Sequence, residues 1–216
     1  MNIEGVYFDI GETLINEGEI YGSWADWLGV PRHTFLAKLG ALLATGGGHP
    51  DLFGYFRPGF DLAKEERMRR EAGIRNGFGA ADLYPDARGC LRELREQGLF
   101  VGIAGNQPAR AQEQFEALGL DHDVLGISDV WGIQKPSPDF FARCAAEAGL
   151  SPERILYVGD RIDNDVRPAL EFGMRAAFLR RGPWGHIQHD PQALARCTFL
   201  LDDLAELPAL VLAHNT

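Results

Sequence analysis

Residues 5–14 read GVYFDIGETL, an apolar run that ends in an acidic residue and a glycine. Short apolar runs bounded by such residues are typical of buried strands in a parallel sheet, because helices cover both faces of such a sheet. Similar runs recur along the chain with amphipathic helical patterns between them. The predicted strands are residues 5–10, 99–104, 123–127, 155–158, 176–179 and 198–201. This alternation predicts an α/β fold with a parallel sheet.

Residues 15–81 interrupt the alternation. They carry many aromatic and leucine side chains but no clear strand pattern, and the turn sequences GGGHP and RPG divide them. We expect a helical insertion over 15–81 in a core domain made of 1–14 and 82–216. A basic stretch within the insertion is expected to be a solvated helix face; it contains Lys64, Arg67, Arg69 and Arg70.

Bulk composition excludes several classes of partner. The formal net charge of −10 and the pI near 5.0 disfavour binding to nucleic acid or to an anionic membrane surface. A small anionic substrate would need a local cation or metal. The three cysteines show no zinc-like spacing, and no secretory or membrane-spanning segment is visible. These features predict a cytoplasmic protein, and they give no indication of its oligomeric state.

Polar residues stand at the ends of the predicted strands. Asp9 follows the apolar residues VYF of the first strand, and Asp160 follows 155–158. Gly105 and Asn106 end the second strand, and Lys135 lies in the loop GIQKPSP after the third. In an open parallel sheet the ligand site lies beyond the carboxyl ends of the strands. We therefore expect two carboxylates, an amide and an ammonium group to converge there.

The residue types suggest a chemistry for this site. Two facing carboxylates repel each other unless a cation lies between them, and Mg²⁺ prefers carboxylate oxygens together with substrate phosphate. A carboxylate such as Asp9 can also attack phosphorus and form an aspartyl-phosphate. Lys135 would neutralise the charge that develops on the phosphoryl group.

Four segments resemble, in order and spacing, the four motifs of haloacid dehalogenase-like (HAD) hydrolases. They are FDIGETL, VGIAGNQ, Lys135 with Pro136, and VGDRIDND with Asp160 and Asp165. The resemblance covers residues 1–14 and about 82–200. It implies a Rossmann-like core with helices on both faces and a small α-helical cap.

The resemblance also implies roles for individual residues. Asp9 would be the nucleophile, and Mg²⁺ would be held by Asp9, the Gly11 carbonyl and Asp160, with Asp165 supporting the metal's waters or Lys135. The backbone of Gly105 and the Asn106 side chain would bind the substrate phosphate, although Asn106 could equally just shape its turn. Asp163 is expected to cap the following helix.

The sequence departs from the family pattern at Gly11. Phosphatases of this family carry a second aspartate here, which protonates the leaving group and later activates water. The next residue, Glu12, could replace it, or it could point to solvent or toward the cap hinge. A third alternative is a substrate whose leaving group needs little protonation.

The function predicted from these residues is a Mg²⁺-dependent phosphatase acting on a small phosphorylated metabolite. The main alternative is a catalytically weak or inactive HAD-fold protein that binds a phosphorylated ligand or a protein partner. A 2-haloacid dehalogenase is less favoured, because the segment DRIDND is acidic enough to suggest a metal.

Overall fold

The computed structural model describes residues 1–216, and the chain divides into two compact units. One unit combines Met1–Asn16 with Leu83–Thr216, and the other is Glu17–Asp82. The first holds every strand, whereas the second is helical. The sequence-based boundaries lie within two residues of these limits. No helix is long and apolar enough to cross a membrane.

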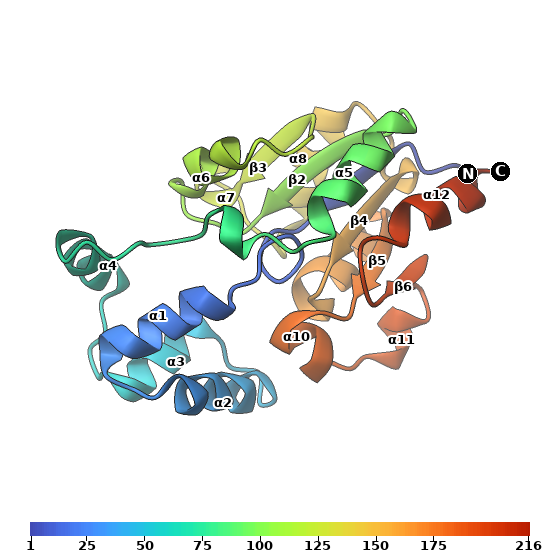
Figure 1. Ribbon diagram of the computed structural model, residues 1–216. Coiled ribbons are helices and arrows are strands. Elements are labelled where there is room, and N and C mark those ends of the chain that lie inside the picture. Colours follow the sequence, from blue (N-terminus) through green and yellow to red (C-terminus); the bar gives the residue numbers. More distant parts are fainter. The chain divides into compact units, whose positions relative to one another are not determined.

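The core unit is built on one six-stranded sheet with the order β3-β2-β1-β4-β5-β6 (Figure 1). All neighbouring strands pair in parallel, and this order is that of doubly wound dinucleotide-binding folds. The predicted α/β Rossmann-like fold is therefore confirmed, and each predicted strand is present with its ends shifted by at most two residues. The strands are β1 Gly5–Phe8, β2 Phe100–Gly105, β3 Val124–Ile127, β4 Ile155–Gly159, β5 Arg175–Leu179 and β6 Phe199–Leu201.

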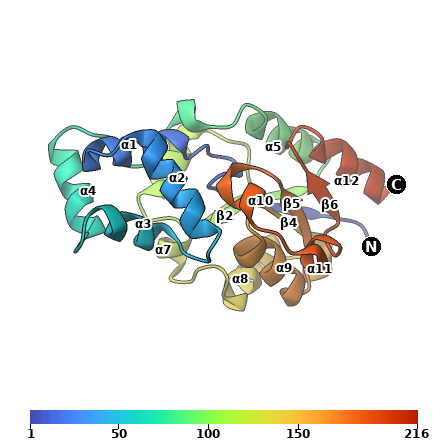
Figure 2. The ribbon, with the colours of Figure 1, turned by 90° about the horizontal axis from the view of Figure 1, so that it is seen from below.

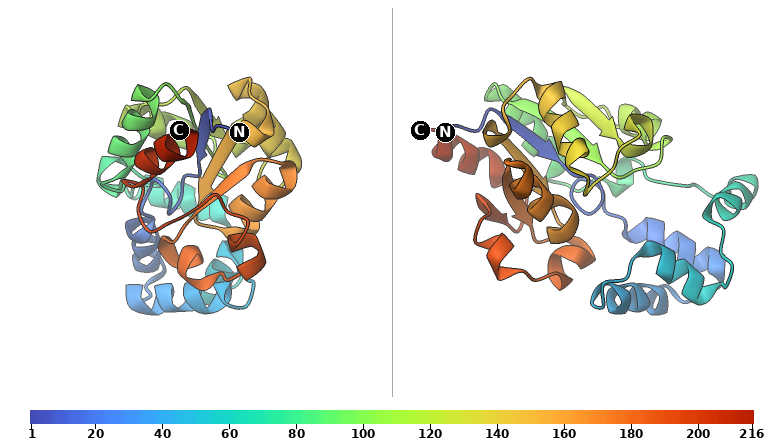
Figure 3. Two further views of the ribbon diagram at one scale, coloured as in Figure 1. Left: turned by 90° about the vertical axis from the view of Figure 1, so that its right-hand side faces the viewer. Right: turned by 180° about the vertical axis from the view of Figure 1, so that it is seen from behind.

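Helices cover both faces of the sheet. Figures 2 and 3 show α5 and α12 on one face and α8 and α9 on the other. The helices of the core unit are α5 Ala87–Glu96, α6 Ala111–Leu118, α7 Ser128–Trp131, α8 Pro138–Ala148, α9 Arg167–Phe172, α10 Gly182–Ile187, α11 Pro191–Leu194 and α12 Leu207–Asn215. Two 3₁₀ turns, Ala80–Asp82 at the end of the helical unit and Pro152–Arg154 in the core, complete the short elements.

Two buried tyrosines join the central strands to their surroundings. Tyr7 on β1 donates a hydrogen bond to the Cys144 carbonyl on α8 at 2.8 Å, and Tyr157 on β4 donates to the Ala104 carbonyl at 2.7 Å. The Tyr7 ring lies against Gly102, where an added Cβ would approach the ring to 2.2 Å. The absence of a side chain at Gly102 thus lets a large aromatic residue pack inside the sheet layer.

The helical unit consists of α1 Gly18–Leu28, α2 Arg32–Leu43, α3 His49–Phe56 and α4 Leu62–Glu71. Its interior is aromatic: Phe53 stacks on Phe60 with ring centroids 4.6 Å apart, and Trp24 meets both rings edge-on. Such pairs stabilise a small core beyond their buried area.

Arg69 on α4 is buried, so the expected solvated face is wrong at this position. Its guanidinium lies 4.0 Å from the centre of the Trp24 ring and donates to the Ser23 carbonyl and hydroxyl and to the Asn76 side chain. Burial of a guanidinium is tolerated when its donors are satisfied in this way. Arg69 therefore links α4 to α1 inside the helical unit.

One local expectation in the core unit is also corrected. Asp163 does not cap a helix; it lies in a π-helical turn, Ile162–Val166, and its carboxylate accepts two hydrogen bonds from the Arg161 guanidinium. The segment around Pro183 begins α10. Proline is favourable in the first turn of a helix, and the buried Trp184 anchors this one.

Candidate active site

The carboxyl ends of three adjacent strands form the site. Asp9 directly follows β1, Gly105 ends β2 and Asp160 directly follows β4. Because β1 pairs with both β2 and β4, these residues lie at the same edge of the sheet. The order of the strands also reverses at β1, which is where open α/β sheets bind their ligands.

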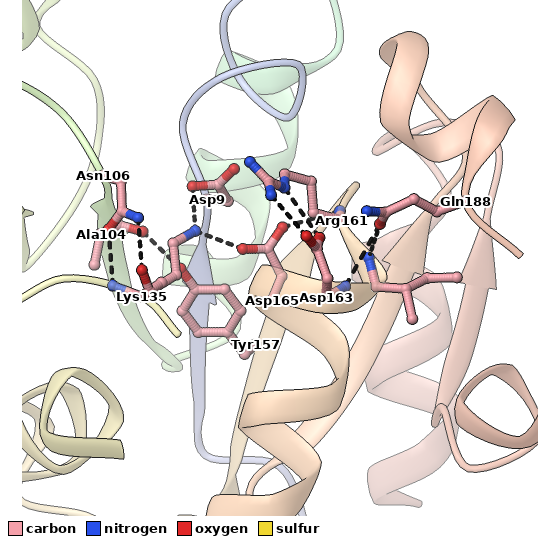
Figure 4. A network of polar contacts seen from close by, with 10 residues as sticks. Asp9, Ala104, Asn106, Lys135, Tyr157, Arg161, Asp163, Asp165 and Gln188 are labelled. Carbon is pink, nitrogen blue, oxygen red and sulfur yellow. Dashed lines mark hydrogen bonds and ion pairs between the residues drawn. The ribbon is translucent and has the colours of Figure 1, made fainter. Parts of the chain in front are cut away.

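Lys135 lies buried between two carboxylates (Figure 4). Its Nζ donates to Asp9 Oδ1 and to Asp165 Oδ1, each at 2.5 Å. Burial acts to lower the pKa of Lys135, but attraction to Asp165 and Asp9 outweighs it and raises the pKa, so the group remains an ammonium ion. One cation is thereby shared by the predicted nucleophile and a carboxylate of the fourth motif.

The side chain of Asn106 holds the loop that carries this lysine. Its Nδ2 donates to the Lys135 carbonyl at 2.9 Å, and its Oδ1 accepts from the Lys135 backbone N–H at 2.8 Å. Both polar ends of the amide are therefore engaged with the lysine backbone. The geometry supports the turn-shaping role for Asn106. The contact of its side chain with the substrate phosphate stays a prediction.

Gly105 lies directly against the Asp9 carboxylate. A Cβ at this position would approach Asp9 Oδ1 to 2.7 Å, closer than real Cβ contacts occur. The glycine thus leaves space for the carboxylate in its present position. Any contact from Gly105 to a substrate would have to come from its backbone.

Three buried carboxylates form a possible metal site. Oxygen atoms of Asp9, Asp160 and Asp165 all lie within 4.8 Å of one another. Burial together with the nearby charge of Asp9 raises the pKa of Asp165 to about 6, although Lys135 opposes this shift. Hard oxygen ligands so close together suit Mg²⁺, which takes one or two protein carboxylates and keeps several waters. The donor set therefore fits the metal predicted from the sequence.

Asp165 is held at both of its oxygens. Oδ1 accepts from Lys135, and Oδ2 accepts from the backbone N–H of Arg161 at 3.0 Å. A Cβ at Gly159 would approach Asp165 Oδ2 to 2.3 Å, so this glycine makes room for the carboxylate. These contacts agree best with a role in supporting Lys135, which is one of the two roles that the resemblance implies.

Glu12 is buried and does not point to solvent. Its Oε2 accepts a hydrogen bond from the Tyr84 hydroxyl at 2.7 Å, and its backbone has a φ of 54°. Gly182, at the start of α10, lies against its side chain. Tyr84 and Gly182 were missed in the sequence, because contacts between residues some 70 to 170 positions apart leave no trace in a local pattern.

Arg161 is a third residue that the sequence did not single out. Its guanidinium pairs with Asp163 and lies 5.1 Å from the centre of the Trp184 ring. Gln188, directly after α10, accepts from the Ile162 N–H at 2.7 Å and so fixes the same turn. Its position directly after Asp160 is the feature of the sequence that could have indicated Arg161 as a site residue.

Comparison with known proteins identifies the family. A family model described as haloacid dehalogenase-like hydrolase matches residues 3–173. The phosphoserine phosphatase of Thermus thermophilus is 32% identical over 205 residues, which cover 83% of this chain and 77% of that protein. The glyceraldehyde 3-phosphate phosphatase of Methanopyrus kandleri is 36% identical over 110 residues. That match covers 50% of this chain and 47% of the relative, so the chain spans about half the length of that relative.

Structural comparison shows the same fold. An L-2-haloacid dehalogenase superposes with a TM-score of 0.69 at 18% identity and covers 98% of this chain and 100% of its own. Phosphatases and dehalogenases thus both occur among similar proteins, and the fold alone does not separate them. Together with the motif order and the geometry of Asp9, Lys135 and Asp160, the family match shows that the chain belongs to the haloacid dehalogenase-like hydrolases.

Proposed function

We propose that the protein is a Mg²⁺-dependent phosphatase that hydrolyses a small phosphorylated metabolite through an aspartyl-phosphate on Asp9. The observation that carries the proposal is the buried Lys135 ammonium between Asp9 and Asp165, with Asp160 completing a cluster of carboxylates within 4.8 Å. Such an arrangement orients a carboxylate nucleophile and supplies positive charge where a phosphoryl group would arrive.

The residues have distinct parts in the proposed reaction. An Asp9 oxygen attacks phosphorus as the bond from phosphorus to the leaving oxygen breaks; water then attacks the same phosphorus and releases Asp9 and inorganic phosphate. Lys135 holds the Asp9 carboxylate in place and offsets charge on the phosphoryl oxygens. Asp9, the Gly11 carbonyl and Asp160, supported by Asp165, would hold Mg²⁺, which supplies further charge stabilisation when bound.

The names of the relatives and the net charge of the chain support a substrate class. The two relatives described above are named for phosphorylated compounds of small size, and the chain's net charge of −10 leaves the local cations to attract an anion. A small phosphate monoester in the cytoplasm is therefore the proposed substrate.

Gly11 favours a second candidate function. It provides no side chain for proton transfer at the position where the family's phosphatases carry an aspartate, and loss of a general acid or base typically slows a reaction about 100-fold to 10,000-fold. A protein that binds a phosphorylated ligand or a protein partner without turnover is the alternative. A dehalogenase is disfavoured because three clustered carboxylates suit a cation better than a halocarboxylate.

A panel of phosphate esters tests these candidates. Release of inorganic phosphate from phosphoserine, glyceraldehyde 3-phosphate, p-nitrophenyl phosphate and acetyl phosphate would be measured with Mg²⁺ and with a chelator. We expect Mg²⁺-dependent turnover in the wild type and none above background in Asp9→Asn. Equal rates in wild type and Asp9→Asn for every ester would refute the phosphatase and favour the binding protein.

A further inference from the structure

A pocket of about 350 Å³ lies in the core unit, where the chain crosses from β5 to β6. The crossover consists of α10, α11 and the short segments around them, and Figure 1 shows these two helices next to β5 and β6. Small-molecule sites in proteins have volumes of about 300–1,000 Å³, so this pocket is large enough for a ligand. Neither the carboxylate cluster nor Lys135 lines it. The pocket is therefore a cavity that the proposed reaction does not use.

One wall of the pocket is apolar. Phe178 on β5 and Leu200 on β6 are register partners, so their side chains extend from the same face of the sheet. Leu194 of α11 lines the pocket beside them. Phe178 is almost completely buried, whereas 60% of Leu200 is exposed. This wall therefore offers apolar surface that a ligand could remove from water.

The rim of the pocket carries hydrogen-bond donors. Arg180 pairs with Asp202 through Nε at 2.8 Å and Nη2 at 2.6 Å, which leaves its Nη1 open to another acceptor. His186 and His189 are both exposed, and neither ring has a hydrogen-bond partner within the chain. An imidazole donates through at least one ring N–H in either protonation state. The rim can thus donate to a ligand from several sides.

Gln188 adds a donor whose orientation is fixed. Its Oε1 accepts from the Ile162 N–H at 2.7 Å, and this bond would be lost if the amide turned over (Figure 4). The Nε2 group at the other end of the amide makes no hydrogen bond within the chain. Because Gln188 lines the pocket, its Nε2 is available to an acceptor there.

Donors at the rim and an apolar wall define the kind of ligand. The one carboxylate of the rim, Asp202, is already paired, so the unpaired groups are mainly donors. A carboxylate suits them best, because it accepts from guanidinium and amide groups in strong hydrogen bonds. We infer that this pocket binds a small carboxylic acid with an apolar body. Its carboxylate accepts from Arg180 and Gln188, and its body covers Leu200. This site goes beyond the proposed phosphatase activity and does not depend on it.

Titration calorimetry of the full chain with 2-naphthoate tests the inference, with a chelator present to keep divalent ions out of the carboxylate cluster. We expect binding at a single site with a Kd below about 1 mM. The uncharged 2-naphthamide has the same rings and should bind at least about tenfold more weakly. Acetate has the charge without the apolar body and should bind too weakly to measure. Equal affinity for the acid and the amide, or no binding of the acid, would overturn the inference.

Three variants place the bound acid. Leu200→Asp puts a charge on the apolar wall, and Gln188→Glu keeps an acceptor for Ile162 but replaces the free donor with a carboxylate oxygen. We expect each to weaken binding of 2-naphthoate at least about tenfold. Leu212→Asp is the matched control, because Leu212 is 54% exposed and lies outside the pocket; its affinity should change less than about threefold.

Unchanged affinity in both pocket variants would place the acid elsewhere, for example at Lys135, and would overturn the inference. An equal loss in Leu212→Asp would do the same, because it would show an effect of added charge alone. Both exposed leucines can be replaced without opening the core, and the melting temperature of each variant checks that it is folded. These readouts measure binding and not turnover, so their failure would leave the proposed function intact.

Discussion

Removing the ammonium group of Lys135 should expose how strongly the site depends on it. The substitution Lys135→Met keeps the length of the side chain but deletes a cation that makes two ion pairs of 2.5 Å. The side chains involved are nearly inaccessible, 1% for Lys135 and 0% for Asp165. Removing one partner of a buried ion pair typically costs about 3–5 kcal/mol, because the other charge remains buried without compensation. We expect a loss of stability within that range.

Urea denaturation in the presence of a chelator would measure this cost. The double variant Lys135→Met with Asp165→Asn removes the uncompensated carboxylate as well, so it should be more stable than Lys135→Met alone by at least about 1 kcal/mol. A Lys135→Met variant within about 1 kcal/mol of the wild type, or a double variant less stable than the single one, would refute the reasoning.

The cost should also depend on pH. The pKa of Asp165 is raised to about 6 in the folded state, above its usual value in the unfolded chain. At a pH between these two pKa values, the folded chain binds a proton on Asp165 more readily than the unfolded chain does. Its contribution therefore favours the folded state at low pH and is lost as the pH rises through 6. Without Lys135 this effect should grow, and the destabilisation of Lys135→Met should be smaller at pH 5 than at pH 8. An equal or larger cost at pH 5 would contradict this assignment.

Three further predictions concern the metal cluster, the space beside Asp9 and the helical unit. Mg²⁺ should raise the melting temperature of the wild type in calorimetry, with a gain in the free energy of unfolding of about 2.7 kcal/mol at a concentration of 100 times its Kd. This gain should be smaller in Asp160→Asn, and an undiminished gain would place the ion elsewhere. Gly105→Ala should lower kcat about tenfold or more, because its Cβ displaces the Asp9 carboxylate, whereas unchanged kinetics would contradict this contact. Arg69→Met should destabilise the protein by about 1–3 kcal/mol in urea unfolding, because it removes the donor to partly buried acceptors on Ser23 and Asn76; a change below about 0.5 kcal/mol would show that the arginine is dispensable.

The sheet could be predicted because its signal is local. The strands β1, β2, β4 and β5 are short apolar runs that are largely buried, and β1 and β4 each lead directly into an acidic residue. Once the strands were known to be parallel, their carboxyl ends had to meet at one edge. Asp9 and Asp160 could therefore be placed near each other from the sequence alone.

Other features depend on contacts between distant segments. The position of the Glu12 side chain is set by Tyr84 and Gly182, and nothing in FDIGETL indicates them. Arg69 belongs to a charged stretch that would normally face water, yet the ring of Trp24 and the acceptors on Ser23 take it into the interior. In each case tertiary packing outweighs the local pattern, so the structure was needed to find the contact.

The central claim, that Asp9 takes up a phosphoryl group, can be tested directly by trapping the intermediate. The wild type would be mixed with acetyl phosphate and Mg²⁺, quenched in acid and digested for mass spectrometry. We predict a phosphoryl adduct on Asp9, within the peptide that includes residues 5–14, and no such adduct in Asp9→Asn or in the presence of a chelator. A phosphoryl group found on another residue, or turnover without any adduct when breakdown is slowed, would contradict this mechanism.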